Sequence, residues 1–358
     1  MKIGILTFHW ATNYGAILQA YALQSYLEGQ GHEVEIVNYK PTSHDLSFLN
    51  LLRNPKSWLH LNKYFKKKNK ETLLAPFRTQ YLHLTKRYSS CEELKEIAFR
   101  YEILISGSDQ VLNPSFTLYG DRKRPTSVYY LSFASPQTKK IGYAVSFGCN
   151  IYPNNAAKYA KMWIKQFDSI GVREKTGLGI VTSLGFTKPA VLVPDPVVLY
   201  GKNVFNRLTL PSIEGKPYIC VYFLRRELQL PASENYRIID DVRSPITMEE
   251  WISTIACSKT LITNSFHGMV VALLNHVPFV IDIEGGRSKG MNDRFYTLLD
   301  CLNLTNRICG EQYSLSELLN IRKIDWEQVD RKLILVQKHG AEYLKTVFDE
   351  SLAPTNIN

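Results

Sequence analysis

Short apolar runs alternate with stretches of helical periodicity along most of the chain. The first run, residues 2–8, is followed by helix-forming residues 16–28 and by a second apolar run at 33–38. This alternation predicts parallel strands joined by covering helices, the doubly wound α/β class. We expect two Rossmann-like domains, an N-terminal one over residues 1–200 and a C-terminal one over residues 217–325.

Three segments depart from this alternation. Residues 41–90 contain three prolines and amphipathic stretches, which predict a basic helical insertion in the first domain. Residues 201–216 predict a linker between the domains, and residues 326–358 a C-terminal helical region. The apolar run at 127–133 predicts a further strand.

The most informative stretch is LITNSFHGMVVALLNHVPFVID at 261–282. It predicts a strand over 260–263, a polar turn, a helix over 269–274 and a strand over 277–283. In doubly wound sheets, ligands bind at the carboxyl ends of the strands. This turn is therefore the first place to look for a functional site.

Three residues of that turn carry the candidate chemistry. Ser265 and Gly268 stand at a predicted helix N-terminus, where backbone N–H groups favour a phosphate or a carboxylate. The His267 imidazole can carry a proton near neutral pH. The alternative is a histidine that serves only packing in a loop or core.

Other polar residues follow the predicted strands of the first domain. Ser108, Asp109 and Gln110 come directly after a strand, and such groups bind sugar hydroxyls. An Asx-type turn is the alternative for Asp109. Asn13 stands in a loop with one glycine, so the GxGxxG dinucleotide fingerprint is absent. Its amide either faces a ligand or caps the next helix.

Three arginines are candidates for binding an anion. Arg173 ends the predicted strand 169–172, where its planar fork suits a carboxylate or phosphate. An ion pair with Glu174 is the alternative. Arg225 ends another predicted strand, and Arg294 lies on a predicted helix.

The charge is concentrated in one segment. The 358 residues include 43 basic and 33 acidic ones, a net charge of +10. Residues 51–90 hold ten basic residues and one acidic residue, with aromatic residues interleaved. A local excess of this kind favours peripheral contact with an anionic membrane surface over nucleic acid binding. A solvated basic insertion is the alternative.

The remaining composition indicates a globular protein of the cytoplasm. Its six cysteines are scattered without a CxxC or metal-ligand spacing, which is typical of free thiols in a reducing compartment. We find no secretory signal and no apolar run of transmembrane length. No metal and no cofactor is expected.

Five motifs occur in order between residues 2 and 307. They are NYGAILQAYALQ, GSDQVLNP, GVREKTG, VPDPV and NSFHGMVVALL, and together they resemble the polysaccharide pyruvyl transferase family. The resemblance implies two facing domains of the glycosyltransferase-B type. It also implies transfer of a pyruvyl group from phosphoenolpyruvate, as co-substrate, to a hexose of a capsular, exopolysaccharide or cell-wall glycan precursor, as a cyclic ketal. Such acceptors are often lipid-linked at the inner face of the membrane.

Roles for the candidate residues follow from this chemistry. The resemblance places the key histidine at His267 and a donor-binding arginine at Arg173. The remaining assignments are hypotheses: catalytic, Asp109; donor-binding, Ser265, Gly268, Arg294 and Arg225; acceptor-binding, Asn13, Ser108 and Gln110. Two alternatives stay open, a nucleotide-sugar glycosyltransferase of the same architecture and a non-catalytic carbohydrate-binding protein of polysaccharide assembly.

Overall fold

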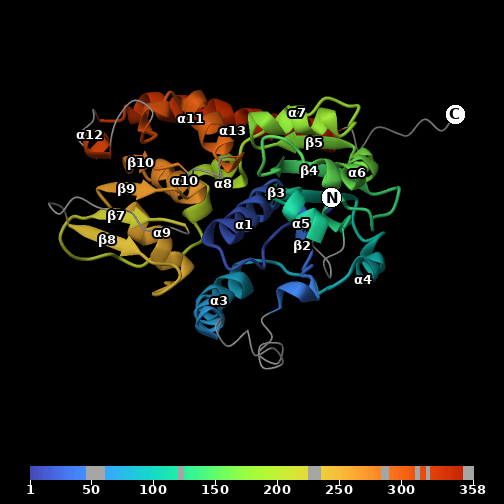
Figure 1. Ribbon diagram of the computed structural model, residues 1–358, viewed down its shortest axis with the longest axis horizontal. Coiled ribbons are helices and arrows are strands. Elements are labelled where there is room, and N and C mark those ends of the chain that lie inside the picture. The colour runs from blue at the N-terminus through green and yellow to red at the C-terminus, as the bar shows by residue number, and fades with distance from the viewer. Residues whose placement is uncertain are drawn as a thin grey trace.

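The computed structural model describes residues 1–45, 61–119, 125–224, 235–283, 290–310, 315–319 and 323–349. Within these residues the chain builds two parallel sheets that lie side by side, each covered by helices (Figure 1). The six-stranded sheet has the order β2-β1-β3-β4-β5-β6, and the four-stranded sheet has the order β10-β9-β7-β8. The predicted α/β class with two Rossmann-like domains is confirmed.

The first sheet and its helices come from the first 205 residues. Its strands are β1 (Lys2–Leu6), β2 (Glu33–Ile36), β3 (Ile103–Asp109), β4 (Lys139–Val145), β5 (Ser169–Val172) and β6 (Val191–Leu192). The α-helices are α1 (Tyr14–Gly29), α3 (Leu61–Tyr81), α4 (Cys91–Leu94), α5 (Pro114–Tyr119), α6 (Asn154–Trp163), α7 (Lys175–Ser183) and α8 (Pro196–Tyr200). Short 3-10 helices cover Thr42–His44, Lys95–Ile97, Val128–Tyr130, Ile164–Gln166 and Gly201–Phe205.

The second sheet follows in sequence. Its strands are β7 (Ile219–Tyr222), β8 (Tyr236–Ile239), β9 (Thr260–Thr263) and β10 (Phe279–Ile281). Its helices are α9 (Met248–Ala256), α10 (Phe266–Leu274), α11 (Asp293–Leu302), a 3-10 turn at Thr305–Arg307, α12 (Leu315–Leu319) and α13 (Trp326–Asp349).

Two local predictions are wrong. The apolar run at 127–133 forms a 3-10 turn instead of a strand, and Leu131 at its end has the left-handed φ of 59°. Helix α10 starts at Phe266 and not at Met269, because the Ser265 hydroxyl accepts a hydrogen bond from the Gly268 N–H at 3.2 Å and caps the helix there. The imidazole of His267 therefore belongs to the first helical turn.

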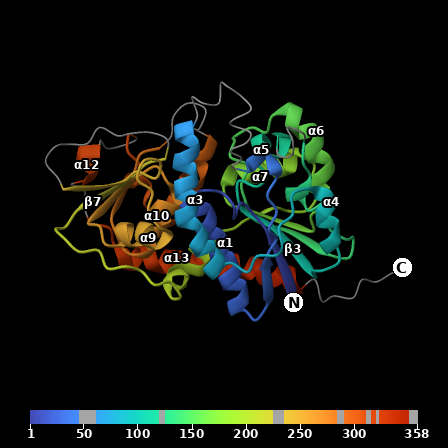
Figure 2. The ribbon, with the colours of Figure 1, turned by 90° about the horizontal axis from the view of Figure 1, so that it is seen from below.

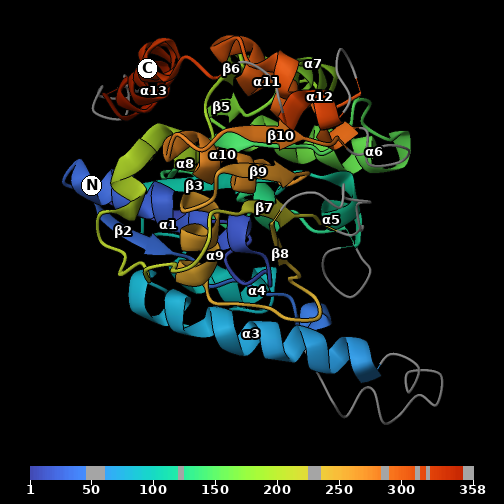
Figure 3. The same cartoon turned by 90° about the vertical axis from the view of Figure 1, so that its left-hand side faces the viewer.

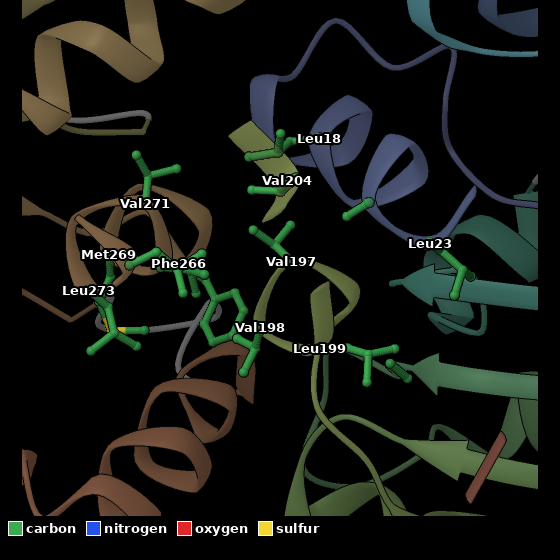
Figure 4. Close-up of a cluster of buried hydrophobic side chains, with 14 of the residues drawn as sticks. Leu18, Leu23, Val197, Val198, Leu199, Val204, Phe266, Met269, Val271 and Leu273 are labelled. Carbon is green, nitrogen blue, oxygen red and sulfur yellow. The ribbon is translucent and has the colours of Figure 1, made fainter. Parts of the chain in front are cut away.

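The two sheets share one hydrophobic core. Helix α1 from the first half, α10 from the second and α8 between them meet side by side, as Leu18, Val197 and Met269 show in Figure 4. Every residue of α10 is buried, which explains why the helix is apolar on all sides. The contact places the N-terminal turn of α10 against the carboxyl edge of the first sheet.

Two long helices cover opposite sides of this junction. Helix α3 lies across it next to α1 (Figure 2), and α13 lies on the other side of the molecule (Figure 3). Although α13 follows the second sheet in sequence, it rests on the first: the Tyr343 hydroxyl donates to the Gly142 carbonyl at 3.1 Å and contacts Ser169 Oγ at 2.9 Å. Close packing of Gly340 on Pro194 allows this approach, since a Cβ there would lie 2.6 Å from the proline ring.

Candidate active site

His267 and Asp195 form a pair across the junction of the two halves. His267 Nε2 lies 3.3 Å from Asp195 Oδ2, and both side chains are buried. Asp195 follows β6 and caps α8, where its Oδ1 accepts from the Val197 N–H at 3.0 Å. Burial alone would raise the pKa of Asp195, but His267 and Arg173 outweigh it and hold the pKa well below the usual range. An ionised carboxylate thus faces the imidazole.

Arg173 stands at the carboxyl end of β5 among three carboxylates. Its Nη1 donates to Asp195 at 2.9 Å, its Nη2 donates to Asp109 at 3.2 Å, and its Nε lies 3.8 Å from Glu174 Oε2. Burial would lower the pKa of Arg173, but attraction by Asp109, Asp195 and Glu174 outweighs this and raises it. Arg173 therefore holds the carboxylates in place, and only its Nε lacks a hydrogen-bond partner.

The first turn of α1 fixes the other side of the imidazole. A Cβ built on Gly15 would lie 2.2 Å from His267 Nδ1, so the glycine backbone packs directly on the ring. The preceding Asn13 caps α1, since its Oδ1 accepts from the Ala16 N–H at 3.1 Å. The structure thus gives Asn13 the capping geometry, one of its two sequence interpretations.

The GSDQ residues face three directions, and the strand runs further than predicted, since Gly107, Ser108 and Asp109 are the last residues of β3. Asp109 reaches Arg173, whereas the Ser108 hydroxyl is buried and donates to the Ala144 carbonyl at 3.1 Å. Gln110 contacts the second half of the chain, its Nε2 lying 3.2 Å from Met291 Sδ. Asp109 joins the charged cluster around Arg173 directly, and the Ser108 hydroxyl touches it at Asp195 Oδ2, 3.5 Å away.

Arg294, on the first turn of α11, has no counter-ion among the residues whose position is described. Its guanidinium lies 5.6 Å from the Phe266 ring centroid and 5.5 Å from that of Phe295. Burial, and secondarily the charge of Arg173, lowers the pKa of Arg294 to about 10. Its Nε is buried without a hydrogen bond, and no carboxylate of the described residues lies within ion-pair distance of it. A guanidinium in this environment favours an anionic ligand.

Glu174 is a second buried group of the cluster that has an atom without a hydrogen-bond partner. Its Oε1 accepts from the Phe147 N–H at 3.1 Å, while its Oε2 is buried without a hydrogen bond. Burial raises the pKa of Glu174 despite the attraction of Arg173. The sequence analysis had considered Glu174 only as a partner for Arg173.

The insertion helix α3 supports the site from outside. Lys70 forms a buried ion pair with Asp241 at 2.6 Å and lies 4.5 Å from the centroid of the Tyr14 ring. Tyr14 in turn stacks on Trp251 and donates to the Ile246 carbonyl at 2.7 Å. Because Tyr14 directly precedes Gly15, this contact fixes the backbone under the His267 ring.

The basic segment is therefore not uniformly outward-facing. Lys70 and Arg78 are buried in ion pairs with Asp241 and Glu71, while Lys68 is exposed. Residues 51–60 of the segment lie outside the described residues, as does Arg225. Burial is the cause of the lowered pKa of Lys70.

Among the residues with a described position, no group of three or more His, Cys, Asp or Glu side chains could hold a metal ion. In the same part of the chain, no helix is both long and apolar enough to cross a membrane.

Comparison with known proteins assigns the family. The model of the polysaccharide pyruvyl transferase family matches residues 13–281, three quarters of the chain. The chain belongs to the polysaccharide pyruvyl transferase family. The matched region contains Asn13, Arg173, Asp195 and His267, which means that the family pattern covers both sides of the junction. No curated protein matches the chain significantly.

Solved structures show the fold of this family member. UDP-N-acetylglucosamine 2-epimerase from Rickettsia bellii is similar with a TM-score of 0.51 and 7% identity, over 98% of this chain and 97% of that one. Anabaena HepE, solved in complex with UDP and glucose, has a TM-score of 0.49 and 8% identity, over 97% of this chain and 100% of that one. The likeness to the epimerase supports the fold of two Rossmann-like halves.

Proposed function

We propose that this pyruvyl transferase moves a pyruvyl group from phosphoenolpyruvate to a hexose of a capsular, exopolysaccharide or cell-wall glycan precursor and closes a cyclic ketal. The observation that carries the proposal is Arg294. It is a partly buried guanidinium, with a buried Nε that has no hydrogen bond and with no carboxylate partner in the described chain, and it lies next to the cluster of Arg173, Asp195 and His267.

Within this cluster, Arg294 is the group that suits an anionic donor. Phosphoenolpyruvate carries a phosphate and a carboxylate, and Arg294 supplies an unpaired cation that binds one of them. The Nε of Arg173 is a further donor without a partner. The N-terminus of α10, capped by Ser265, adds a helix dipole that favours an anion. We assign the donor to this side of the site.

The His267–Asp195 pair supplies the proton transfers. Asp195 Oδ2 lies 3.3 Å from His267 Nε2 and orients the imidazole, which can take up and release a proton near neutral pH. In the first step a sugar hydroxyl adds to C2 of the donor, and the imidazole passes the hydroxyl proton to C3, which returns the imidazole to its neutral form. In the second step a neighbouring hydroxyl attacks C2 and gives its proton to the imidazole, the C2–O bond to phosphate breaks, phosphate leaves, and the ketal closes. Each step needs a base for a hydroxyl proton, which is the role of His267.

The acceptor lies on the side of the first domain in this proposal. Asp109 ends β3 beside Arg173, and its carboxylate is about one sixth exposed. A partly exposed carboxylate fits the hydrogen-bonding needs of sugar hydroxyls. The buried hydroxyl of Ser108 instead supports the loop that carries Asp109.

Ligand-induced stabilisation of the purified protein tests the donor assignment. Phosphoenolpyruvate at about 100 times its dissociation constant is expected to add about 2.7 kcal/mol to the unfolding free energy. Arg294→Met should abolish this shift. Arg331→Met is the matched control, because Arg331 is exposed and pairs only with its helix neighbour Glu327. A shift with a nucleotide-sugar but none with phosphoenolpyruvate would overturn the proposal in favour of a glycosyltransferase.

We further propose that the outer face of α3 contacts an anionic membrane, where a lipid-linked acceptor would be met. Phe65 is 54% exposed and Lys68 is exposed on this helix. Co-sedimentation with anionic vesicles should weaken as salt is raised. Binding that does not respond to salt would count against this contact.

A further inference from the structure

A cavity of about 460 Å³ lies between α11 and α13, above β6 and the start of α8. Helix α11 contributes Arg294, Thr297, Leu298 and Cys301, and α13 contributes Lys332, Leu335, Val336 and His339. Each set has the spacing of one helical face, so two facing helices form the walls. The volume is within the range of small-molecule sites.

The cavity runs from a buried charged end to an exposed mouth. Arg173 and Asp195 line it and are 3% and 2% exposed, whereas Leu335, which also lines it, is 66% exposed. Between these ends the lining is mostly aliphatic and aromatic, with Val198, Leu298 and Phe266 among it. The cavity is thus apolar along its length, with two guanidiniums at its inner end.

Phosphoenolpyruvate alone leaves this space unexplained. It is small and polar throughout, so it would satisfy the arginines but not the apolar walls. A nucleotide would need polar partners for its base and ribose, and among the described lining residues the uncharged polar side chains are few: Thr297, with Cys301 and His339. Ordered water is also disfavoured where few polar groups are available.

We infer that the cavity binds an anionic amphiphile, a single hydrocarbon chain with a phosphate or carboxylate head. The head lies at Arg294 and Arg173, beside the Asp195 carboxylate that Arg173 already pairs with, and it gives Arg294 the counter-ion that the described residues do not supply. The chain lies between α11 and α13 and leaves past Leu335. Lys332 and His339 beside the mouth add no negative charge that would oppose its entry.

Such a ligand would regulate the enzyme. The same two arginines are proposed to hold phosphoenolpyruvate, so the amphiphile and the donor compete for them. This consequence, unlike the binding itself, rests on the proposed function. A chain-bearing phosphate that accumulates at a membrane would then slow pyruvyl transfer.

A homologous series of alkyl phosphates tests the binding. Affinity measured by calorimetry with butyl, hexyl and octyl phosphate should rise about fourfold for each added methylene, the value expected for burial of a CH₂ group. Octyltrimethylammonium, with the opposite charge, should not bind. Octanoate compared with octyl phosphate distinguishes a fatty acid from a lipid phosphate as the source. Equal affinity across the series would overturn the inference.

Two adjacent residues of α13 provide a matched pair of variants. Leu335 lines the cavity and Ile334 does not, although both are exposed aliphatic residues on the same helix. Leu335→Asp should weaken octyl phosphate binding at least tenfold, and Ile334→Asp should leave it unchanged. Equal effects of both variants would contradict the assigned cavity.

The outcome separates this inference from the proposed function. Leu335→Asp should retain the stabilisation by phosphoenolpyruvate, because Leu335 is exposed at the mouth of the cavity whereas Arg173 is buried. If phosphoenolpyruvate does not bind but the alkyl series behaves as expected, the proposed donor is wrong and the cavity assignment holds. If phosphoenolpyruvate binds and chain length has no effect, the cavity assignment fails alone.

Discussion

Replacement of Gly15 by alanine should disable the imidazole without unfolding the protein. The added Cβ would lie 2.2 Å from His267 Nδ1 and 2.6 Å from Cγ, whereas an ordinary contact needs 3.4 Å. The ring or the backbone must therefore move by about 1.2 Å. Misplacement of a catalytic group by about 1 Å can cost about 100-fold in rate. We expect a fall in kcat of that order for Gly15→Ala.

The assay is the release of phosphate from phosphoenolpyruvate in the presence of a glycan acceptor. Gly29→Ala is the control, because Gly29 ends the same helix and a Cβ there meets no atom within 4 Å. It should keep full activity and gain up to about 1 kcal/mol of stability from the higher helix propensity of alanine. A Gly15→Ala variant with a rate within twofold of the wild type would refute the role given to this contact.

Three further predictions concern single side chains. Lys70→Met should lower the unfolding free energy by about 3–5 kcal/mol, because it leaves Asp241 buried without its ion-pair partner. Lys68→Met on the exposed face should have little effect, and adding Asp241→Leu to Lys70→Met should restore the lost stability. Denaturant titration measures the unfolding free energy of all three variants. Burial lowers the pKa of His9 from 6.5 to about 4, so between these pH values the His9 imidazole is protonated in the unfolded state only. The unfolding free energy should therefore fall by about 3 kcal/mol as the pH drops from 6.5 to 4. His9→Gln should remove this pH dependence. His267→Gln should reduce kcat by about 10²- to 10⁴-fold, and near wild-type turnover would exclude an acid–base role.

The local sequence pattern was sufficient to predict the class of fold and part of the charged cluster around Arg173. Strands of a parallel sheet end at a common edge, so residues that follow different strands meet there. Asp109 at the end of β3 and Arg173 after β5 are 64 residues apart in sequence and within 3.2 Å in space. Sequence spacing alone predicts such a meeting once the strands are recognised.

Contacts that depend on how two sheets pack could not be predicted in this way. Asp195 follows the two-residue strand β6 and attracted no functional assignment, yet it contacts both His267 and Arg173. Its position between two prolines at a strand end was the available signal. Gly15 likewise has no feature in sequence that points to an imidazole on another sheet.

The run of basic residues at 51–90 was the least reliable guide to which side chains face solvent. Lys70 belongs to a run of cations that favoured a surface, but Asp241, 171 residues away, draws it inward. The helical period of α3 places Lys70 on one face and Lys68 on another, and only the tertiary partner decides which face is buried. The apolar run at 127–133 failed as a strand for a similar reason, since local hydrophobicity does not distinguish a buried turn from a strand.

The core that the two sheets share has a consequence for how the protein comes apart. Residues of β1, α9, α10 and α13 belong to a single buried cluster, so neither half retains a complete hydrophobic interior once the other is lost. Heating should therefore give one calorimetric transition whose van't Hoff and calorimetric enthalpies agree, rather than two separate melting events. Amide protons of both sheets should accordingly exchange with solvent through the same global opening.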